Sequence, residues 1–285
     1  MLLWTVRTCQ KVATLCVFVV ALAATGWAQE IEVTLLGTGD PQPSIDRFGP
    51  SILVRAQDLV VVVDAGRGAI QRLAQLGVSF ADVDAVLLTH LHSDHIVGLP
   101  DLWLTGWLVS GRDRPLKVFG PPGTRGLIDH LRQAFAYDIG IRIEDDRVPT
   151  AGARIAVIEI EEGLVLKDGD VEVMAFDVDH RPVAPALGYR FDLDTRSVVL
   201  SGDTRLSSHL IDTAQDVDLL VHEVGDAPPE LLQDNERVRR VVAHHTTAAD
   251  VGRVFTRARP KMAVLSHLTL LGGFSVADLV EGVRT

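Results

Sequence analysis

A stretch of seven residues, 89–95, concentrates side chains that could bind metal ions. Its sequence is Thr-His-Leu-His-Ser-Asp-His, and its four donors are His90, His92, Asp94 and His95. On a strand, alternation would direct the first two histidines to one side, and a turn would bring the Asp–His pair to a second point nearby. Imidazole nitrogen and carboxylate oxygen suit Zn²⁺, and a catalytic zinc keeps an open position for water. The stretch therefore predicts a site for two adjacent divalent metals rather than a group of surface histidines.

Three more nitrogen or oxygen donors each follow a predicted strand later in the chain. They are His180, Asp203 and His267, after the apolar runs 171–178, 197–201 and 262–266. A single such residue is usually a turn residue or a helix cap. Three of them after the first motif favour metal ligation for all three.

Apolar strands and helices alternate along the chain and must position these donors. Strands are expected at 31–36, 51–55, 59–63, 84–88, 117–119, 154–160, 171–178, 186–191, 197–201, 219–221 and 262–266. Helices are expected at 69–76, 102–109, 124–136 and 275–283. No linker, low-complexity tract or charge block interrupts this pattern, so the sequence predicts one layered α/β domain over residues 29–285.

Residues 1–28 have the composition of a secretory signal. Arg7 and Lys11 precede the apolar run 12–24, and small residues, ending with Ala28, follow it. The rival is an uncleaved membrane anchor, but the run is shorter than the ~20 apolar residues that a spanning helix needs. Cleavage after Ala28 would leave no membrane span and would place the mature protein in the periplasm or outside the cell.

The predicted mature chain is acidic and free of cysteine. Both cysteines, Cys9 and Cys16, lie in the leader, so disulfides and thiolate ligands are excluded from the mature chain. Cleavage would change the formal charge from −11 to −13. This acidity argues against nucleic acid as a partner, because phosphate binding requires many Lys and Arg. A small anionic substrate stays open, because bound metals supply a local positive field.

The first motif resembles the signature of the metallo-β-lactamase superfamily. Its flank, residues 96–102, is similar to the branch that holds ribonuclease Z and the arylsulfatase-like hydrolases. Further matches cover nearly the whole mature chain, at 35–39, 64–66, 120–125, 179–190, 201–205, 222–223, 245–252 and 265–268. The resemblance implies an α/β fold of the αββα metallo-β-lactamase sandwich type, a single domain with the site at one edge between two sheets.

The resemblance also implies how the donors divide between two zinc ions. One ion would be held by His90, His92 and His180, the other by Asp94, His95 and His267, with Asp203 bridging them. A water shared by the two metals, as a bridging hydroxide, would attack a phosphorus, sulfur or carbonyl centre.

The same resemblance implies that His245 transfers a proton to the leaving group and that Glu223 is the acidic partner that orients it. Asp94 completes the expected catalytic set. An ordinary surface carboxylate is the alternative for Glu223. Asp64 would either cap the helix at 69–76 or orient metal ligands from behind. The remaining histidines are expected to be structural, solvated or without a role: His130, His209, His222 and His244.

Three functions are compatible with this site. The favoured one is an exported binuclear zinc hydrolase of small-molecule esters, such as aryl sulfates, phosphate esters or lactones. The alternative is a ribonuclease Z-type tRNA 3′-processing endonuclease. Against it, the arm that clamps tRNA in that family is missing, since His180 and Asp203 are only 23 residues apart. The third is an iron-dependent oxygenase or a metal-binding protein without turnover, which the second donor set disfavours. A homodimer is compatible with the sequence.

Overall fold

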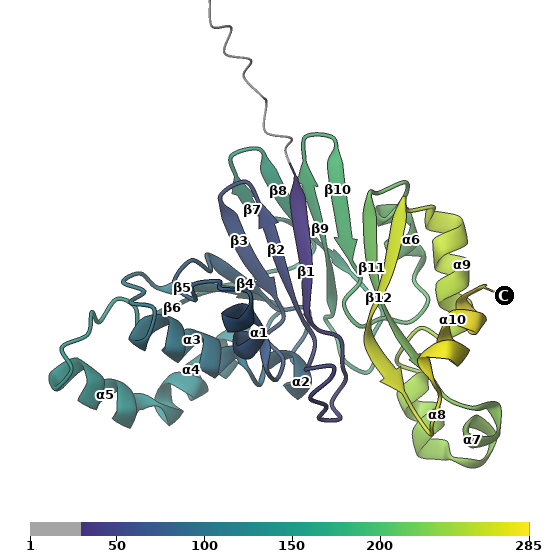
Figure 1. The fold of residues 1–285 in the computed structure, drawn as a ribbon, viewed down its shortest axis with the longest axis horizontal. Coiled ribbons are helices and arrows are strands. Elements are labelled where there is room, and N and C mark those ends of the chain that lie inside the picture. The colour runs from purple at the N-terminus through teal and green to yellow at the C-terminus, as the bar shows by residue number, and fades with distance from the viewer. Residues whose placement is uncertain (1–29, 285) are drawn as a thin grey trace, which may run out of the picture.

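Two β-sheets of six strands each pack face to face in the computed structural model, which describes residues 30–284 (Figure 1). The first sheet has the order β1 (Ile31–Gly37), β2 (Ser51–Ala56), β3 (Leu59–Val63), β4 (Ala85–Leu87), β5 (Leu116–Gly120) and β6 (Ile155–Glu159). The second has the order β12 (Met262–Leu270), β11 (Leu219–Asp226), β10 (Arg196–Leu200), β9 (Leu187–Leu193), β8 (Val171–Asp177) and β7 (Gly163–Asp168).

Helices cover the outer faces of both sheets. The first half of the chain contributes α1 (Ala69–Gln75), α2 (Ser93–Ile96), α3 (Leu99–Leu108), α4 (Thr124–Ala134) and α5 (Ala136–Glu144). The second half contributes α6 (Ser208–Thr213), α7 (Pro229–Asp234), α8 (Glu236–Val242), α9 (Ala248–Ala258) and α10 (Val276–Arg284). The predicted αββα sandwich is therefore the observed fold.

Strand β3 illustrates how the sequence produces these layers. Val61 and Val63 pack in the core between the two sheets, whereas Val62 packs against the helices outside the first sheet. Successive side chains on a strand point to opposite faces, so a strand covered on both faces is apolar at every position. This explains why the run 59–63 is continuously apolar rather than alternating.

Strand β4 before the first motif, β10 before Asp203 and β12 with His267 each run parallel to at least one neighbour. Strand β8 before His180 is antiparallel to β9, which is antiparallel to β10, so β8 ends at the same edge as β10. In the first sheet β3, β4, β5 and β6 are parallel, and in the second β10, β11 and β12 are parallel. Parallel strands end at the same edge of a sheet, so the loops that follow them meet there. This edge lies at the bottom of Figure 1, beside α2.

Some elements differ from the sequence-based expectation. Strand β7 was not predicted, because it is a partly exposed edge strand whose apolar run is only three residues long. The helix expected at 124–136 is two helices, α4 and α5, which meet at Phe135. The apolar run at 219–221 is the start of a longer strand, β11, which continues through Glu223.

No helix within residues 30–284 is long and apolar enough to cross a membrane. The leader at 1–28 and both cysteines lie outside the described residues. The signal sequence, its cleavage and the exported location therefore stay predictions, as do the domain boundaries.

Candidate metal centre and active site

The first histidine motif lies in a loop rather than on a strand. Strand β4 ends at Leu87 and helix α2 begins at Ser93, so the motif spans the connection between them. Two hydrogen bonds hold this loop to the second sheet: Tyr189 Oη donates to the Leu88 carbonyl at 2.7 Å, and Leu187 N donates to the Thr89 carbonyl at 2.9 Å. The expectation that strand alternation aligns the first two histidines was wrong; the loop does so.

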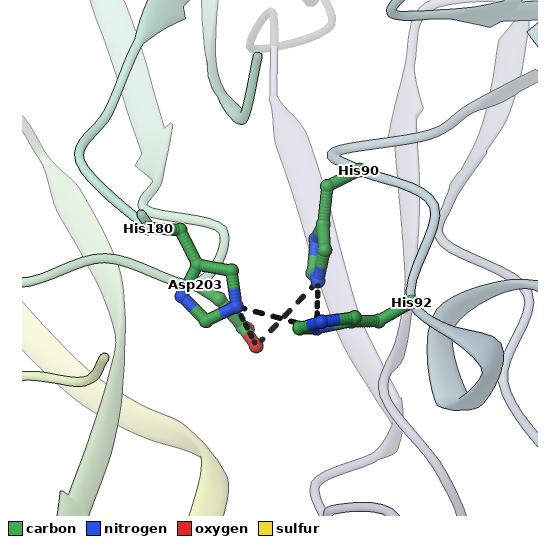
Figure 2. A group of neighbouring side chains, drawn as sticks. All are labelled: His90, His92, His180 and Asp203. Atoms are coloured by element: carbon green, nitrogen blue, oxygen red, sulfur yellow. Dashed lines mark hydrogen bonds and ion pairs between the residues drawn. The ribbon is translucent and has the colours of Figure 1, made fainter. Parts of the chain in front are cut away.

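The first group of donors consists of His90, His92, His180 and Asp203 (Figure 2). Nδ1 of His92 lies 2.9 Å from Nε2 of His90 and 3.3 Å from Nε2 of His180. Oδ2 of Asp203 lies 3.8 Å from Nε2 of each of the other two histidines. Only His92 is half-buried, and the other three are buried, so the group opens to solvent on the His92 side.

The second group consists of Asp94, His95 and His267, and Asp203 of the first group also lies beside it. Oδ2 of Asp94 lies 3.6 Å from Nε2 of His95 and 3.3 Å from Nε2 of His267. The same Oδ2 of Asp203 lies 3.4 and 3.3 Å from these two nitrogens. One carboxylate oxygen is thus the common neighbour of both groups.

These distances fit a pair of divalent cations. Ligand atoms ~2.1 Å from a tetrahedral Zn²⁺ lie about 3.4 Å from one another, which is the spacing seen here. In addition, Nε2 of His95 is buried and has no hydrogen-bond partner among the described residues. A buried polar atom without a partner is costly, and a metal ion in this position would satisfy it. The geometry brings all seven predicted ligands together; their role as ligands stays a prediction.

The imidazoles are held in orientation by contacts to their other ring nitrogen. His180 Nδ1 donates to the His244 carbonyl at 2.9 Å, and His95 Nδ1 donates to the Asp64 carboxylate at 2.7 Å. Such contacts fix the tautomer that presents Nε2 to a metal. No sequence pattern indicated this role for His244, because its backbone carbonyl, not its side chain, makes the contact.

Burial and mutual charge set the protonation of the donors. Burial lowers the pKa of His180 to about 4 and the pKa of His90 well below its ordinary value, so both imidazoles are neutral. Burial alone would raise the pKa of Asp203, but the imidazoles of His267 and His95 lower it well below its usual range. Neutral imidazole and ionised carboxylate are the forms that bind metals.

A β-bulge directs His267 into the site. Strand β12 continues to Leu270 instead of ending before this residue. Ser266 pairs with Glu223 and Leu268 with Val224, so His267 is the extra residue of the bulge, with a positive φ of 44°. A bulge re-aims a side chain, and a left-handed backbone at a non-glycine residue is a strain often found at functional sites.

His245 and Glu223 form a pair beside the second donor group. Nδ1 of His245 lies 3.1 Å from Oε2 of Glu223, which is 2% exposed and accepts a hydrogen bond from Thr246 N at 2.8 Å. The His245 ring stacks on His267 with centroids 5.4 Å apart. Burial opposes protonation of His245, but Glu223 outweighs it and raises the pKa of His245 to about 9. Glu223 is therefore not a surface carboxylate.

Asp64 contacts the site and does not cap a helix. Its carboxylate accepts hydrogen bonds from Thr89 N, Thr89 Oγ1 and His95 Nδ1 at 2.7–2.8 Å. The residue at the start of α1 is Gly68, without a side-chain cap. Of the two roles open for Asp64, the structure supports orientation of His95.

Replacing Asp64 with asparagine is expected to weaken metal binding by ~10–100-fold, because the amide cannot hold His95 Nδ1–H in the same way. Competition with a chromogenic chelator measures this affinity. Asp58→Asn, which changes an exposed carboxylate in the turn between β2 and β3, is the control. Equal affinities of the two variants would show that Asp64 has no role in orientation.

The other histidines do not join the donor groups. His130 is exposed, His209 lies 3.5 Å from Glu162 at the surface, and His222 is buried with Nδ1 against the Glu223 carbonyl. Within the described part of the chain, none of them belongs to a group that could hold a metal.

A comparison with protein families agrees with the fold and the site. Residues 60–268 match the model of the Beta-lactamase superfamily domain. Together with two facing sheets and the histidine–aspartate groups at their edge, this match defines a metal-dependent hydrolase of the metallo-β-lactamase fold.

Comparison with individual proteins shows which branch of this class of hydrolases the chain resembles. A protein named ribonuclease Z from Mycobacterium marinum is 41% identical over 239 residues, which are 83% of this chain and 86% of that protein. The solved structure of the human short-form tRNase Z has a TM-score of 0.65 at 24% identity, over 84% of this chain and 93% of that one. The metallo-β-lactamase-fold protein YhfI from Bacillus subtilis has a TM-score of 0.67 at 19% identity, over 89% of this chain and 92% of that one. This chain belongs to the ribonuclease Z-like branch of the beta-lactamase superfamily.

This relationship corrects two expectations from the sequence. A hydrolase of small-molecule esters was favoured and nucleic acid was disfavoured as a partner, and both interpretations were wrong, because the relatives are named as nucleases. An identity of 41% over 83% of the chain outweighs the one missing arm between His180 and Asp203. The charge argument failed because net charge describes the whole chain, whereas an RNA contacts one local surface.

Proposed function

We propose that this protein is a ribonuclease Z-type endonuclease that hydrolyses a phosphodiester bond at the 3′ end of precursor tRNA. The observation that supports this most directly is the convergence of seven metal donors beside the His245–Glu223 pair. It occurs in a chain that is 41% identical to a ribonuclease Z over 83% of its length.

Two Zn²⁺ ions are the proposed cofactors. Five imidazoles and two carboxylates, without a thiolate, form a donor set that suits zinc. His90, His92 and His180 would hold one ion, Asp94, His95 and His267 the other, and Asp203 would contact both. When bound, such a pair of ions activates water for attack and stabilises the negative charge that develops on phosphoryl oxygens.

The chain's own residues supply orientation and a proton. Asp64 and the His244 carbonyl fix the rings of His95 and His180, so that their Nε2 atoms point into the site. Glu223 accepts a hydrogen bond from Nδ1 of His245, so Nε2 is the ring nitrogen of His245 that can act on the substrate. A protonated His245 can donate from Nε2 to the leaving oxygen, and Glu223 stabilises that charge.

Processing of a precursor tRNA tests this proposal. Residues 29–285, the predicted mature chain, contain every donor and are the protein to use. Zinc-loaded protein is expected to release the 3′ trailer, chelation to stop the reaction, and added Zn²⁺ to restore it; mapping of the product ends checks the position of cleavage. His92→Ala should abolish cleavage, whereas His130→Ala, at an exposed histidine outside both donor groups, should not. A zinc-loaded protein that leaves precursor tRNA intact would overturn the proposal.

A further inference from the structure

We propose that a groove between α9 and α10 binds the phosphate backbone of the RNA substrate, several nucleotides away from the metals. The inference rests on the proposed nuclease function. The groove has a volume of about 480 Å³ and is lined by Arg253 and Arg257 of α9, by Val283 and Arg284 of α10, and by Leu206. Helices α9 and α10 lie together on the outer side of the second sheet (Figure 1).

Two glycines allow the two helices to approach closely enough to form this groove. A Cβ at Gly252 would collide with the Val283 carbonyl, and a Cβ at Gly282 would lie 2.7 Å from Cβ of Ala248. Because neither glycine has a side chain, the end of α10 packs directly against α9. This contact places Arg284 beside the two arginines of α9.

The groove is cationic in a chain that is acidic overall. Its lining includes three arginines and no aspartate or glutamate, although the formal net charge of the chain is −11. Arg253 pairs with Asp250 at 2.6 Å and stays 69% exposed. Within residues 30–284, no carboxylate oxygen lies within 4.0 Å of the charged groups of Arg257 and Arg284. Exposed guanidinium groups without an acidic partner are well suited to phosphate contacts.

Arg205 connects the lining of the groove to two segments of the metal site. Leu206 follows Arg205, whose guanidinium donates to the Ala243 carbonyl at 2.6 Å and to the Arg181 carbonyl at 2.7 Å. These two carbonyls belong to the segments that carry His245 and His180. An RNA strand that runs from the metal site along Arg205 is expected to reach the groove at Leu206.

The distance between the metal site and the groove decides which substrates the groove can affect. Helix α9 begins at Ala248, three residues after His245. A helix rises ~1.5 Å per residue, so Arg257 lies about 14 Å further along its axis. A small phosphodiester bound at the metals is too short to reach this arginine, whereas an RNA strand, with a phosphate at every nucleotide, is not. The groove should thus contribute to RNA binding and not to the chemical step.

The double variant Arg257→Ala/Arg284→Ala tests the groove. Loss of two phosphate contacts is expected to raise KM and Kd for precursor tRNA roughly 10-fold and leave kcat unchanged. The slope of log Kd against log salt should decrease by about 2. Hydrolysis of bis(p-nitrophenyl) phosphate should not change, because this substrate does not reach the groove. The matched control is Arg55→Ala/Arg114→Ala, which removes the same formal charge from β2 and from the loop before β5 in the first sheet, whereas α9 packs on the second sheet.

These measurements test RNA binding by the groove separately from the proposed nuclease function. Affinity for labelled tRNA, measured by fluorescence anisotropy, reports on the groove whether or not cleavage occurs. Equal RNA affinities of the groove variant and its control would overturn the proposal that the groove binds RNA. A change of oligomeric state with unchanged RNA affinity would also overturn it, since the groove would then join copies of the chain. An intact precursor tRNA with wild-type protein would overturn the nuclease function instead.

Discussion

Replacing Asp203 with alanine is expected to remove both metal ions and to abolish measurable hydrolysis. A single oxygen of this side chain lies within 3.8 Å of donor nitrogens in both groups. Its loss also leaves a cluster of buried imidazoles without the anion that they surround. The rate should fall by more than the ~10²–10³-fold that loss of one stabilising donor at an active site typically costs. Metal analysis of the purified variant and kcat on precursor tRNA measure the two effects.

A control is needed because Asp203 is buried and its removal could unfold the protein. Asp203→Asn keeps the shape and removes the charge, and circular dichroism shows whether each variant is folded. Asp168→Ala, at the exposed end of β7, should retain both metals and full activity. A folded Asp203→Ala protein with two bound metals and activity within tenfold of the wild type would refute the bridging role.

Replacing His245 with alanine should reduce kcat by ~10²–10⁴-fold without loss of metal, because only the proton donor is removed. The size of the loss should depend on the leaving group. An RNA alkoxide needs a proton as it departs, whereas p-nitrophenolate is stable without one. We therefore expect a large effect on precursor tRNA and a small effect on bis(p-nitrophenyl) phosphate. Steady-state kinetics on both substrates, with metal analysis, test this prediction.

Glu223 acts through His245, so the two substitutions should not be additive. Glu223→Gln is expected to lower kcat by roughly 10–100-fold, as is usual for the partner of an active-site histidine. In a protein that already lacks His245, the same change should have little further effect. His209→Ala, at a partly exposed histidine outside the site, is the control. Equal losses on both substrates would contradict the role of His245 as an acid and point to a structural role.

The N-terminal half of the site could be predicted from local sequence alone. His90, His92, Asp94 and His95 lie within six positions, so their proximity follows from the covalent chain whatever its backbone conformation. For this reason the four side chains lie close together although the strand assumed to carry them is a loop.

For the donors far along the chain from the first motif, the sequence indicated the kind of residue but not the backbone geometry that positions it. Apolar runs before Asp203 and His180 indicated strand ends. The bulge that turns His267 inward, by contrast, depends on its pairing with β11. The burial of Glu223 likewise depends on the length of β11, which extends beyond the apolar run that predicted it. Strand register and length are set by neighbouring strands, and a single run of residues contains no information about its neighbours.

The amino-acid sequence alone specifies which chemical groups are available: imidazole and carboxylate donors, an acid–base pair and apolar strands to carry them. The packing of the fold sets which of these groups become neighbours, from the single oxygen of Asp203 between two donor groups to the His244 carbonyl behind His180. It also decided that three arginines from two helices line one groove in an acidic chain. The physical reason is that residue chemistry is a local property, whereas convergence over a hundred residues depends on how the two sheets pack.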